Sequence, residues 1–270
     1  MSAFNRILRP LLIRIPSSNR WERIWKLAQV DFKKRYYNDR FGLFWALLNP
    51  LLRVCVYYIA FTFLIGRGGD SIDNFALFLF SALIFWMEFV QTLKKGIRLI
   101  QQKSYLIENI QLNKLDLYYS LVVSSFLGFS FNLLAYFFFA AFFQIAYSWD
   151  LLLLPLLVLN LYLFGIGGGM ILAIVYIYFQ DIMHIIDILI LFGFWTSGIF
   201  FDPQVILNIF PPAYYLNPFL GIIENVRNLI LNNSPLNYQI FLINIIFGIV
   251  IAIVGCLLLK RYSHLAIERK

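Results

Sequence analysis

Long apolar runs alternate with short polar segments along most of this chain. A helix that crosses a bilayer needs about 20 mostly apolar residues. Six runs approach or exceed that length: residues 43–65, 75–93, 115–147, 151–179, 183–201 and 239–259. The third run is too long for one upright crossing of a hydrocarbon core about 30 Å thick, so we expect it to tilt or to project into water. The pattern predicts an all-α integral membrane protein with six transmembrane helices.

The segment before the first run, residues 1–42, is basic and amphipathic. It holds ten lysines and arginines against three acids. From Arg20 onward, apolar residues recur at three- and four-residue spacing: Trp21, Ile24, Trp25, Ala28 and Phe32. This spacing predicts a helix that lies at the membrane interface before the chain enters the first span. The alternative is a basic face beside a soluble core.

The region between the fifth and sixth runs, residues 203–238, is interrupted by five prolines: Pro203, Pro211, Pro212, Pro218 and Pro235. Its apolar pieces are too short to cross a bilayer, so we expect short re-entrant or surface helices there. The polar loop at 94–114 mixes charges with isoleucine and leucine. It predicts a short amphipathic helix that presents a surface either to another protein or to lipid headgroups.

Composition and charge place the chain in a bilayer and orient it. Hydrophobic residues make up 61% of the chain and charged residues 13%, whereas a soluble domain has about 25% charged residues. Of the 22 lysines and arginines, ten lie in residues 1–42, five in 94–114 and four in the basic tail 260–270. Because such residues accumulate in cytoplasmic segments, we predict that both termini are cytoplasmic. The positions of these charges along the chain therefore matter more than the net charge of +8, and we expect no nucleic-acid partner.

No motif for catalysis or nucleotide binding is recognisable in the sequence. The phosphate-binding pattern Gly-x-x-x-x-Gly-Lys-Ser/Thr is absent. Gly165-Ile-Gly-Gly-Gly169 lies inside an apolar run, where small residues four apart favour close helix packing. His184 and His264 are far apart and have no metal-ligand companions in the sequence. We expect no metal, no cofactor and no enzyme activity of its own, which disfavours an integral-membrane transferase.

Three ionisable residues lie inside apolar runs: Arg53, Glu88 and Asp187. A charge at the centre of a spanning helix costs about 2.5–3.5 kcal/mol on insertion scales, so it normally faces a partner or water. At 1.5 Å per residue, the predicted depths of Arg53 and Glu88 differ by roughly 6 Å, which a long arginine can bridge. We hypothesise that these two pair or line one polar path. The alternative is a pair that only fixes helix register.

A set of motifs resembles one known family, the membrane subunits of ABC-2-type exporters for lipid-linked polysaccharides. The motifs are Asp31-Phe-Lys-Lys-Arg35-Tyr36, Gly42-x-x-Trp45, Asn49-Pro50, Gln180-Asp181-Ile182, Phe194-Trp195-x-Ser197, and Asn217-Pro218 followed by Ile223 and Arg227. They cover most of the chain in the family's order and spacing. Two positions depart from the family pattern, which often has arginine at the position of Gln180 and proline at that of Gly198.

The resemblance implies a homodimer of this subunit with two cytoplasmic ABC ATPase subunits in a bacterial inner membrane. ATP and magnesium would bind to those partners rather than to this chain, which would also contact membrane lipids. By analogy the helix at 20–40 is the interface helix, and the segment around Gln102 to Gln111 is the coupling helix, seated in an ATPase groove. The coupling residues would be Gln102, Lys103, Tyr105 and Glu108. Short helices within 203–235 would close the extracellular mouth, with gate residues Pro218, Phe219, Glu224 and Arg227.

The substrate implied by the resemblance is a glycan on undecaprenyl diphosphate or a similar lipid. Such a substrate requires cations for its charge and aromatic rings on which sugars can stack. The expected entrance and path residues are Lys33, Lys34, Arg35, Tyr36, Tyr37, Arg40, Trp45, Arg53, Tyr57, Phe85, Trp86 and Glu88. For each aromatic residue the alternative is core packing or the interfacial belt. The expected function is export of a lipid-linked polysaccharide, O-antigen first, with capsule, teichoic acid, another lipid or a drug as alternatives.

Overall fold

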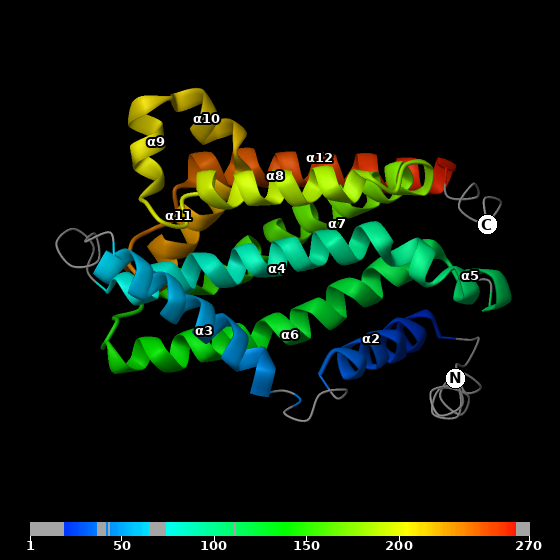
Figure 1. Ribbon diagram of the computed structural model, residues 1–270, viewed down its shortest axis with the longest axis horizontal. Coiled ribbons are helices and arrows are strands. Elements are labelled where there is room, and N and C mark those ends of the chain that lie inside the picture. Colours follow the sequence, from blue (N-terminus) through cyan, green and yellow to red (C-terminus); the bar gives the residue numbers. More distant parts are fainter. Residues whose placement is uncertain (1–18, 37–41, 43, 65–73, 111, 263–270) are drawn as a thin grey trace.

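The computed structural model describes residues 19–36, 42, 44–64, 74–110 and 112–262, and every regular element within these ranges is a helix. The helices are α2 (Arg20–Tyr36), α3 (Phe44–Ile59), η1 (Ala60–Leu64), α4 (Phe75–Gln102), α5 (Ser104–Ile110), α6 (Lys114–Phe142), η2 (Trp149–Leu153), α7 (Leu154–Tyr178), α8 (Ile182–Thr196), α9 (Pro203–Ile209), α10 (Pro211–Leu216), α11 (Pro218–Ile230) and α12 (Tyr238–Tyr262). Figure 1 shows the long helices running back and forth between two ends of an elongated bundle. The all-α class is thus confirmed for the described chain.

Within the described residues, four helical stretches are long and apolar enough to cross a membrane: α4, α6, α12 and the joined pair η2–α7. Two further apolar helices are shorter, Leu48–Phe63 within α3–η1 and Ile182–Thr196, which is α8. They occupy the places of the first and fifth predicted spans. The structure therefore supports a multi-pass membrane protein with four long candidate spans, and six crossings remain a prediction.

Several helices end at other residues than the hydrophobic runs indicate. α4 continues to Gln102, so the first part of the predicted loop at 94–114 is helical. The reason is that lysine and arginine are good helix formers, so a helix can continue from lipid into water where hydropathy has already changed. α6 ends at Phe142 rather than at residue 147. α8 ends at Thr196, shortly before Gly198, whose positive φ of 76° is incompatible with continuing the helix.

Glycines bring α7 close to two neighbours, α4 and α12. A Cβ on Gly169 would lie 3.1 Å from the Gly96 Cα of α4. A Cβ on Gly167 would lie 2.7 Å from the backbone nitrogen of Ala252 in α12. Backbones can approach this closely only where no side chain intervenes. The glycines of the 165–169 segment therefore serve helix packing, as the sequence pattern favours.

The N-terminal helix α2 packs along α6 with only part of its predicted apolar stripe. Ile24 and Ala28 of the stripe are buried, together with Leu27, whereas Trp21 and Trp25 are 71% and 47% exposed. Two arginines of α2 approach the buried Asp116 of α6: Arg20 Nη2 at 2.7 Å from Oδ1 and Arg23 Nη2 at 3.9 Å from Oδ2. The helix is therefore attached to the bundle on one side, and both tryptophans remain available for the membrane interface.

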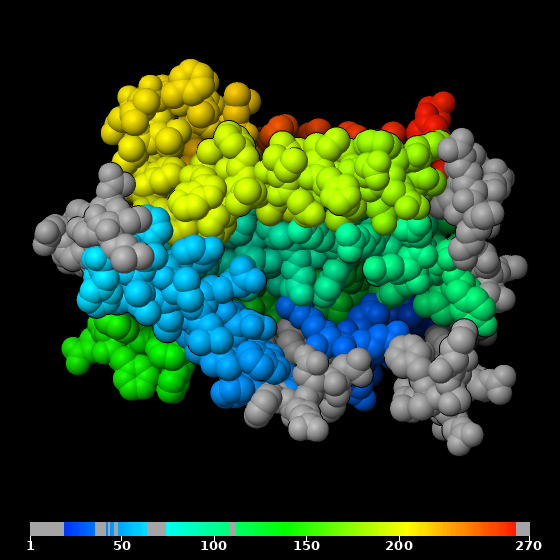
Figure 2. Space-filling view, viewed as in Figure 1, coloured from blue at the N-terminus to red at the C-terminus, as the bar shows by residue number. Residues whose placement is uncertain are grey.

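Apolar side chains also cover outward faces of α8 and α12. Ile188 and Phe192 of α8 and Ile246 and Ile253 of α12 are mostly exposed. Such faces suit lipid or another subunit and are unfavourable in water. Figure 2 shows α8 lying across one face of the molecule and α9 with α10 projecting at one end. In Figure 1, α5 and the end of α12 lie at the opposite end of the bundle.

Candidate functional site

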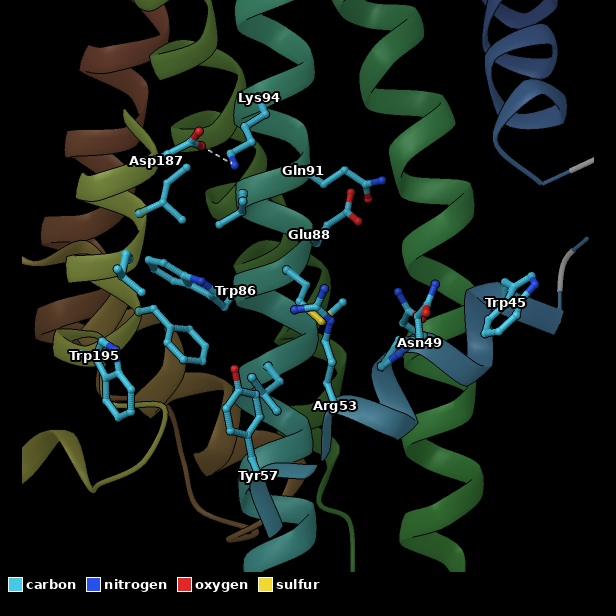
Figure 3. Close-up of a pocket in the computed structure, with 18 of the residues that line it drawn as sticks. Trp45, Asn49, Arg53, Tyr57, Trp86, Glu88, Gln91, Lys94, Asp187 and Trp195 are labelled. Atoms are coloured by element: carbon cyan, nitrogen blue, oxygen red, sulfur yellow. Dashed lines mark ion pairs between the residues drawn. The ribbon is translucent and has the colours of Figure 1, made fainter. Parts of the chain in front are cut away.

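A cavity of about 780 Å³ lies between α3, α4 and α8 (Figure 3). Arg35 of α2 and Asn132 of α6 complete its wall. Six of the expected path residues line it: Arg35, Trp45, Arg53, Tyr57, Trp86 and Glu88. The fold therefore gathers residues from the interface helix and from four apolar helices around one space.

Three cationic side chains line the cavity, and they differ in their partners. Arg35 Nη2 donates a hydrogen bond to Gln91 Oε1 of α4 at 2.5 Å. Lys94 Nζ lies 2.6 Å from Asp187 Oδ1, and this ion pair joins α4 to α8 across the cavity wall. Arg53 of α3 points into the cavity and forms no hydrogen bond or ion pair with any residue that the structure describes.

Glu88 is a buried carboxylate in the wall of the cavity, with 2% of its surface exposed. Its Oε1 accepts hydrogen bonds from Tyr162 Oη of α7 at 2.9 Å and from Thr92 Oγ1 at 3.2 Å. No ion pair joins it to Arg53 among the described residues, so the pairing hypothesis is wrong in this structure. The physical reason is that the Glu88 carboxylate already accepts hydrogen bonds from two hydroxyl groups, Tyr162 of α7 and Thr92 of its own helix α4. The second possibility, that Arg53 and Glu88 line one polar path, agrees with the structure, because both residues line the same cavity.

Aromatic rings form a second part of the wall. Tyr57 of α3 packs against Phe194 and Phe200, with ring centroids 5.6 and 5.3 Å away. Trp86 of α4 lies edge-on to Phe219 at 5.0 Å. Trp195 of α8 is 54% exposed and faces the same space. The cavity thus presents ring surfaces beside charged groups.

Some expected path residues lie away from this cavity. Phe85 is fully buried against Phe129 of α6, with ring centroids 5.1 Å apart, so it is a core residue. Phe85 and Trp86 are adjacent on a helix and therefore point about 100° apart, and only the second faces the cavity. Lys33 and Lys34 are exposed on α2 and do not line the cavity. Tyr37, Arg40 and the side chain of Tyr36 lie outside the described residues.

Other lining residues were not among the expected path residues. Asn49, Gln91, Lys94, Asp187 and Trp195 all line the cavity. Asp187 carried a sequence signal as an acid inside an apolar run, and Asn49 and Trp195 lie in the family motifs. Gln91 and Lys94 carried no comparable signal, because they lie at the polar end of an apolar run where such residues are ordinary.

The coupling segment forms α5, but its predicted residues have different surroundings. Tyr105 is 66% exposed and Gln102 is exposed. Lys103 forms an ion pair with Asp31 of α2, so its charge has a partner within this chain. The side chain of Glu108 lies outside the described residues. Contact of this segment with an ATPase stays a prediction.

A second cavity of about 680 Å³ lies at the end of the bundle that holds α9 and α11. Of the four predicted gate residues, Glu224 and Arg227 line it. Pro218 begins α11, and its carbonyl accepts a hydrogen bond from Asn244 of α12 at 3.0 Å. Phe219 is buried against α4. The structure therefore separates these four residues into two cavity-lining and two packing positions.

Arg227 is a buried guanidinium that binds main-chain carbonyls. Nη1 donates to Gly198 O at 2.7 Å and to Phe201 O at 3.2 Å, and Nη2 donates to Ile199 O at 2.8 Å and to Phe78 O at 3.3 Å. Its charge also lies 3.3 Å above the centre of the Phe78 ring. This side chain therefore holds the segment after α8 against the start of α4.

Glu224 joins three parts of the same end. Its carboxylate accepts hydrogen bonds from Gln204 of α9 at 3.0 Å, from Asn237 at 3.1 Å and from the Tyr214 hydroxyl of α10. Burial and the adjacent carboxylate raise the pKa of Tyr214 above its ordinary value, so this hydroxyl stays protonated as a donor. Glu224 thus ties α9, α10 and the start of α12 to α11.

Comparison with known proteins identifies the family. The model of the ABC-2 type transporter family matches residues 22–231. The chain belongs to the ABC-2 type transporter family. One relative of this ABC-2 chain is the O-antigen export system permease protein RfbA of Klebsiella pneumoniae, 25% identical over 240 residues, which cover 88% of this chain and 91% of the relative. The protein of the same name from Myxococcus xanthus is 27% identical over 180 residues, or 67% of this chain and 68% of the relative.

As an ABC-2 membrane domain, the chain is a permease component, and the family implies partnership with an ABC ATPase. Within the described ranges, no group of three or more potential metal ligands occurs. What the cavity offers is positive charge, amide and carboxylate groups, and aromatic faces. These groups can bind a solute that carries negative charge and flat apolar surfaces.

Proposed function

We propose that this chain is the permease subunit of an ATP-driven exporter that moves a lipid-linked polysaccharide across the bacterial inner membrane. O-antigen is the first candidate for that polysaccharide. The observation that carries the proposal is the cavity of about 780 Å³ that combines three cations with several aromatic rings. An anionic lipid carrier needs the cations, and sugar rings stack on aromatic faces. The relatives named as O-antigen export permeases support this choice of substrate.

The working unit in this proposal is a homodimer of the chain with two cytoplasmic ABC ATPases, which bind ATP and magnesium. Both termini face the cytoplasm, and six helices cross the membrane. α5 and its neighbours contact the ATPase, because α5 lies at one end of the bundle with Tyr105 exposed. The short helices α9–α11 lie at the other end of the bundle, and in this proposal that end faces the exterior.

Deletion of the gene tests the substrate. The expected result is that O-antigen disappears from the cell surface and accumulates inside on its lipid carrier, and that the intact gene restores export. Loss of capsule or teichoic acid from the surface with normal O-antigen would instead assign the exporter to that glycan. Unchanged surface glycans would contradict the proposal.

A matched pair of tryptophan variants tests the cavity itself. Trp195 and Trp149 are both exposed, but only Trp195 lines the cavity. Trp195→Ala is expected to reduce O-antigen export severalfold, because a stacking surface is lost, while Trp149→Ala leaves export unchanged. Equal export by both variants at equal protein levels would show that the cavity does not lie on the transport path.

A further inference from the structure

Arg53 is a charged side chain in an apolar helix, and nothing in the described chain binds it. It lies on α3 and is exposed to the cavity. A cation in a membrane helix is costly unless water, a ligand or an opposite charge compensates it. In Figure 3 its guanidinium points into the space between Asn49 on one side and Tyr57 with Trp86 on the other.

The acids of the same cavity already have other donors. Glu88 accepts hydrogen bonds from Tyr162 and Thr92. Asp187 forms its ion pair with Lys94. The three cations and two acids that line the cavity therefore leave one positive charge in excess, and Arg53 is the cation without a partner among the described residues.

We propose that Arg53 binds the phosphate or diphosphate group of the exported lipid-linked glycan. This inference rests on the proposed function and adds the residue that recognises the anionic end of the substrate. A guanidinium carries five N–H donors in a planar fork that can hold a phosphate through two parallel hydrogen bonds. Asn49, one helical turn before Arg53, lines the same wall and offers an amide donor.

Lys94 provides a second cation for the same anion. Its ion pair with Asp187 is partly open to solvent, with 38% and 50% of the two side chains exposed. Such exposed pairs contribute little to stability, so the lysine can exchange its carboxylate for a phosphate. The exchange would also release α8 from α4 at this point, since the pair joins the two helices.

Binding of farnesyl diphosphate to the purified complex with its ATPase tests the site. Quenching of tryptophan fluorescence reports binding, because Trp45, Trp86 and Trp195 line the cavity. Arg53→Gln is expected to weaken binding about tenfold to a hundredfold, the loss typical of a hydrogen bond between charged groups. Arg53→Lys should lose less, because it keeps the charge. Arg98→Gln, an exposed arginine of α4 outside the cavity, should bind as the native complex does.

Two further probes identify the group that is recognised. Farnesol lacks the phosphates and should bind equally to the native and Arg53→Gln complexes. Inorganic pyrophosphate lacks the lipid, and its competition with farnesyl diphosphate in the native complex would place the contact at the phosphates. Competition by pyrophosphate that persists unchanged in Arg53→Gln would overturn the proposal.

The remaining outcomes separate this inference from the proposed function. Equal affinity of Arg53→Gln and native complex for farnesyl diphosphate overturns the phosphate site, even if gene deletion still blocks O-antigen export. Dissociation of the Arg53→Gln homodimer in size-exclusion chromatography would also overturn it, by assigning Arg53 to the contact between subunits. If the Arg53→Gln complex loses affinity for farnesyl diphosphate but gene deletion leaves O-antigen on the cell surface, the phosphate site is retained. In that case O-antigen is rejected as the substrate.

Discussion

Arg227 stabilises one end of the molecule through main-chain oxygens rather than through an acid. It is 2% exposed and donates to four carbonyls, three of them in the segment that follows α8. Arg227→Met keeps the length but leaves those carbonyls without their donor. We expect a loss of about 1–3 kcal/mol in the free energy of unfolding, or more if several carbonyls stay unpaired, because a buried acceptor left without its donor costs about that much.

Thermal unfolding of the detergent-solubilised protein, followed by tryptophan fluorescence, measures this loss. Arg98→Met removes an exposed arginine from α4 and serves as the control. A melting temperature of Arg227→Met equal to that of the control would show that the buried contacts contribute nothing.

The same residue shows what sequence can indicate about a single side chain. The motif placed Arg227 in the extracellular gate region, and the structure puts it beside a cavity there. Its partners could not be predicted, because every residue carries a carbonyl and only the fold selects four of them. Trp86 and Phe85 illustrate the same limit. Both are aromatic, and only the rotation of α4 decides which one reaches the cavity.

Close helix contact at α7 gives a prediction at the scale of elements. Gly167→Ala would place a Cβ 2.7 Å from the backbone of α12, which cannot yield without moving the helix. Gly168→Ala would meet only the end of the Leu93 side chain, at 3.1 Å. The first variant is therefore expected to unfold at a temperature several degrees lower, while the second stays close to the native protein. Equal melting temperatures for the two variants would contradict the α7–α12 packing.

The link between α2 and the end of α4 predicts a charge-swap effect. Asp31 of α2 pairs with Lys103, directly before α5. If movements of α5 reach α2 through this pair, Asp31→Lys and Lys103→Asp should each reduce O-antigen export severalfold, and the double variant should recover it. Swapping Glu22 and Lys26, a partly exposed ion pair within α2 at 2.6 Å, should have little effect. A double variant as defective as the single ones would exclude this transmission.

Helices were easier to predict than their ends. Apolar periodicity found α2 and hydrophobic length found the long spans, because burial in lipid or protein selects those patterns. The end of α4 was missed, since its helix continues through Lys94 and Lys95 after the apolar run has stopped. Only part of the predicted apolar stripe of α2 is buried in the bundle: Ile24 and Ala28 are buried, whereas Trp21 and Trp25 are exposed.

At the scale of the whole molecule, six crossings require the two short apolar helices, Leu48–Phe63 and α8, to span the membrane. α8 has 15 residues, which span about 22 Å at 1.5 Å per residue, against a hydrocarbon core of about 30 Å. A short helix can still cross if the bilayer thins locally or flanking residues reach the interface. The concentration of basic residues in three segments that should share one side requires an even number of crossings.

Single cysteines on either side of α8 test whether this short helix crosses the membrane. In a variant without Cys55 and Cys256, we expect Asn208→Cys, after α8, to react with a membrane-impermeant maleimide in intact cells with a permeabilised outer membrane. Asp181→Cys, before α8, should react only after the inner membrane is broken. Labelling of both from the same side would show that α8 does not cross, and the chain would then have to return α9–α11 to the cytoplasmic end. That result would contradict the assignment of Glu224 and Arg227 to an extracellular gate, because both residues would then lie on the side of the ATPases.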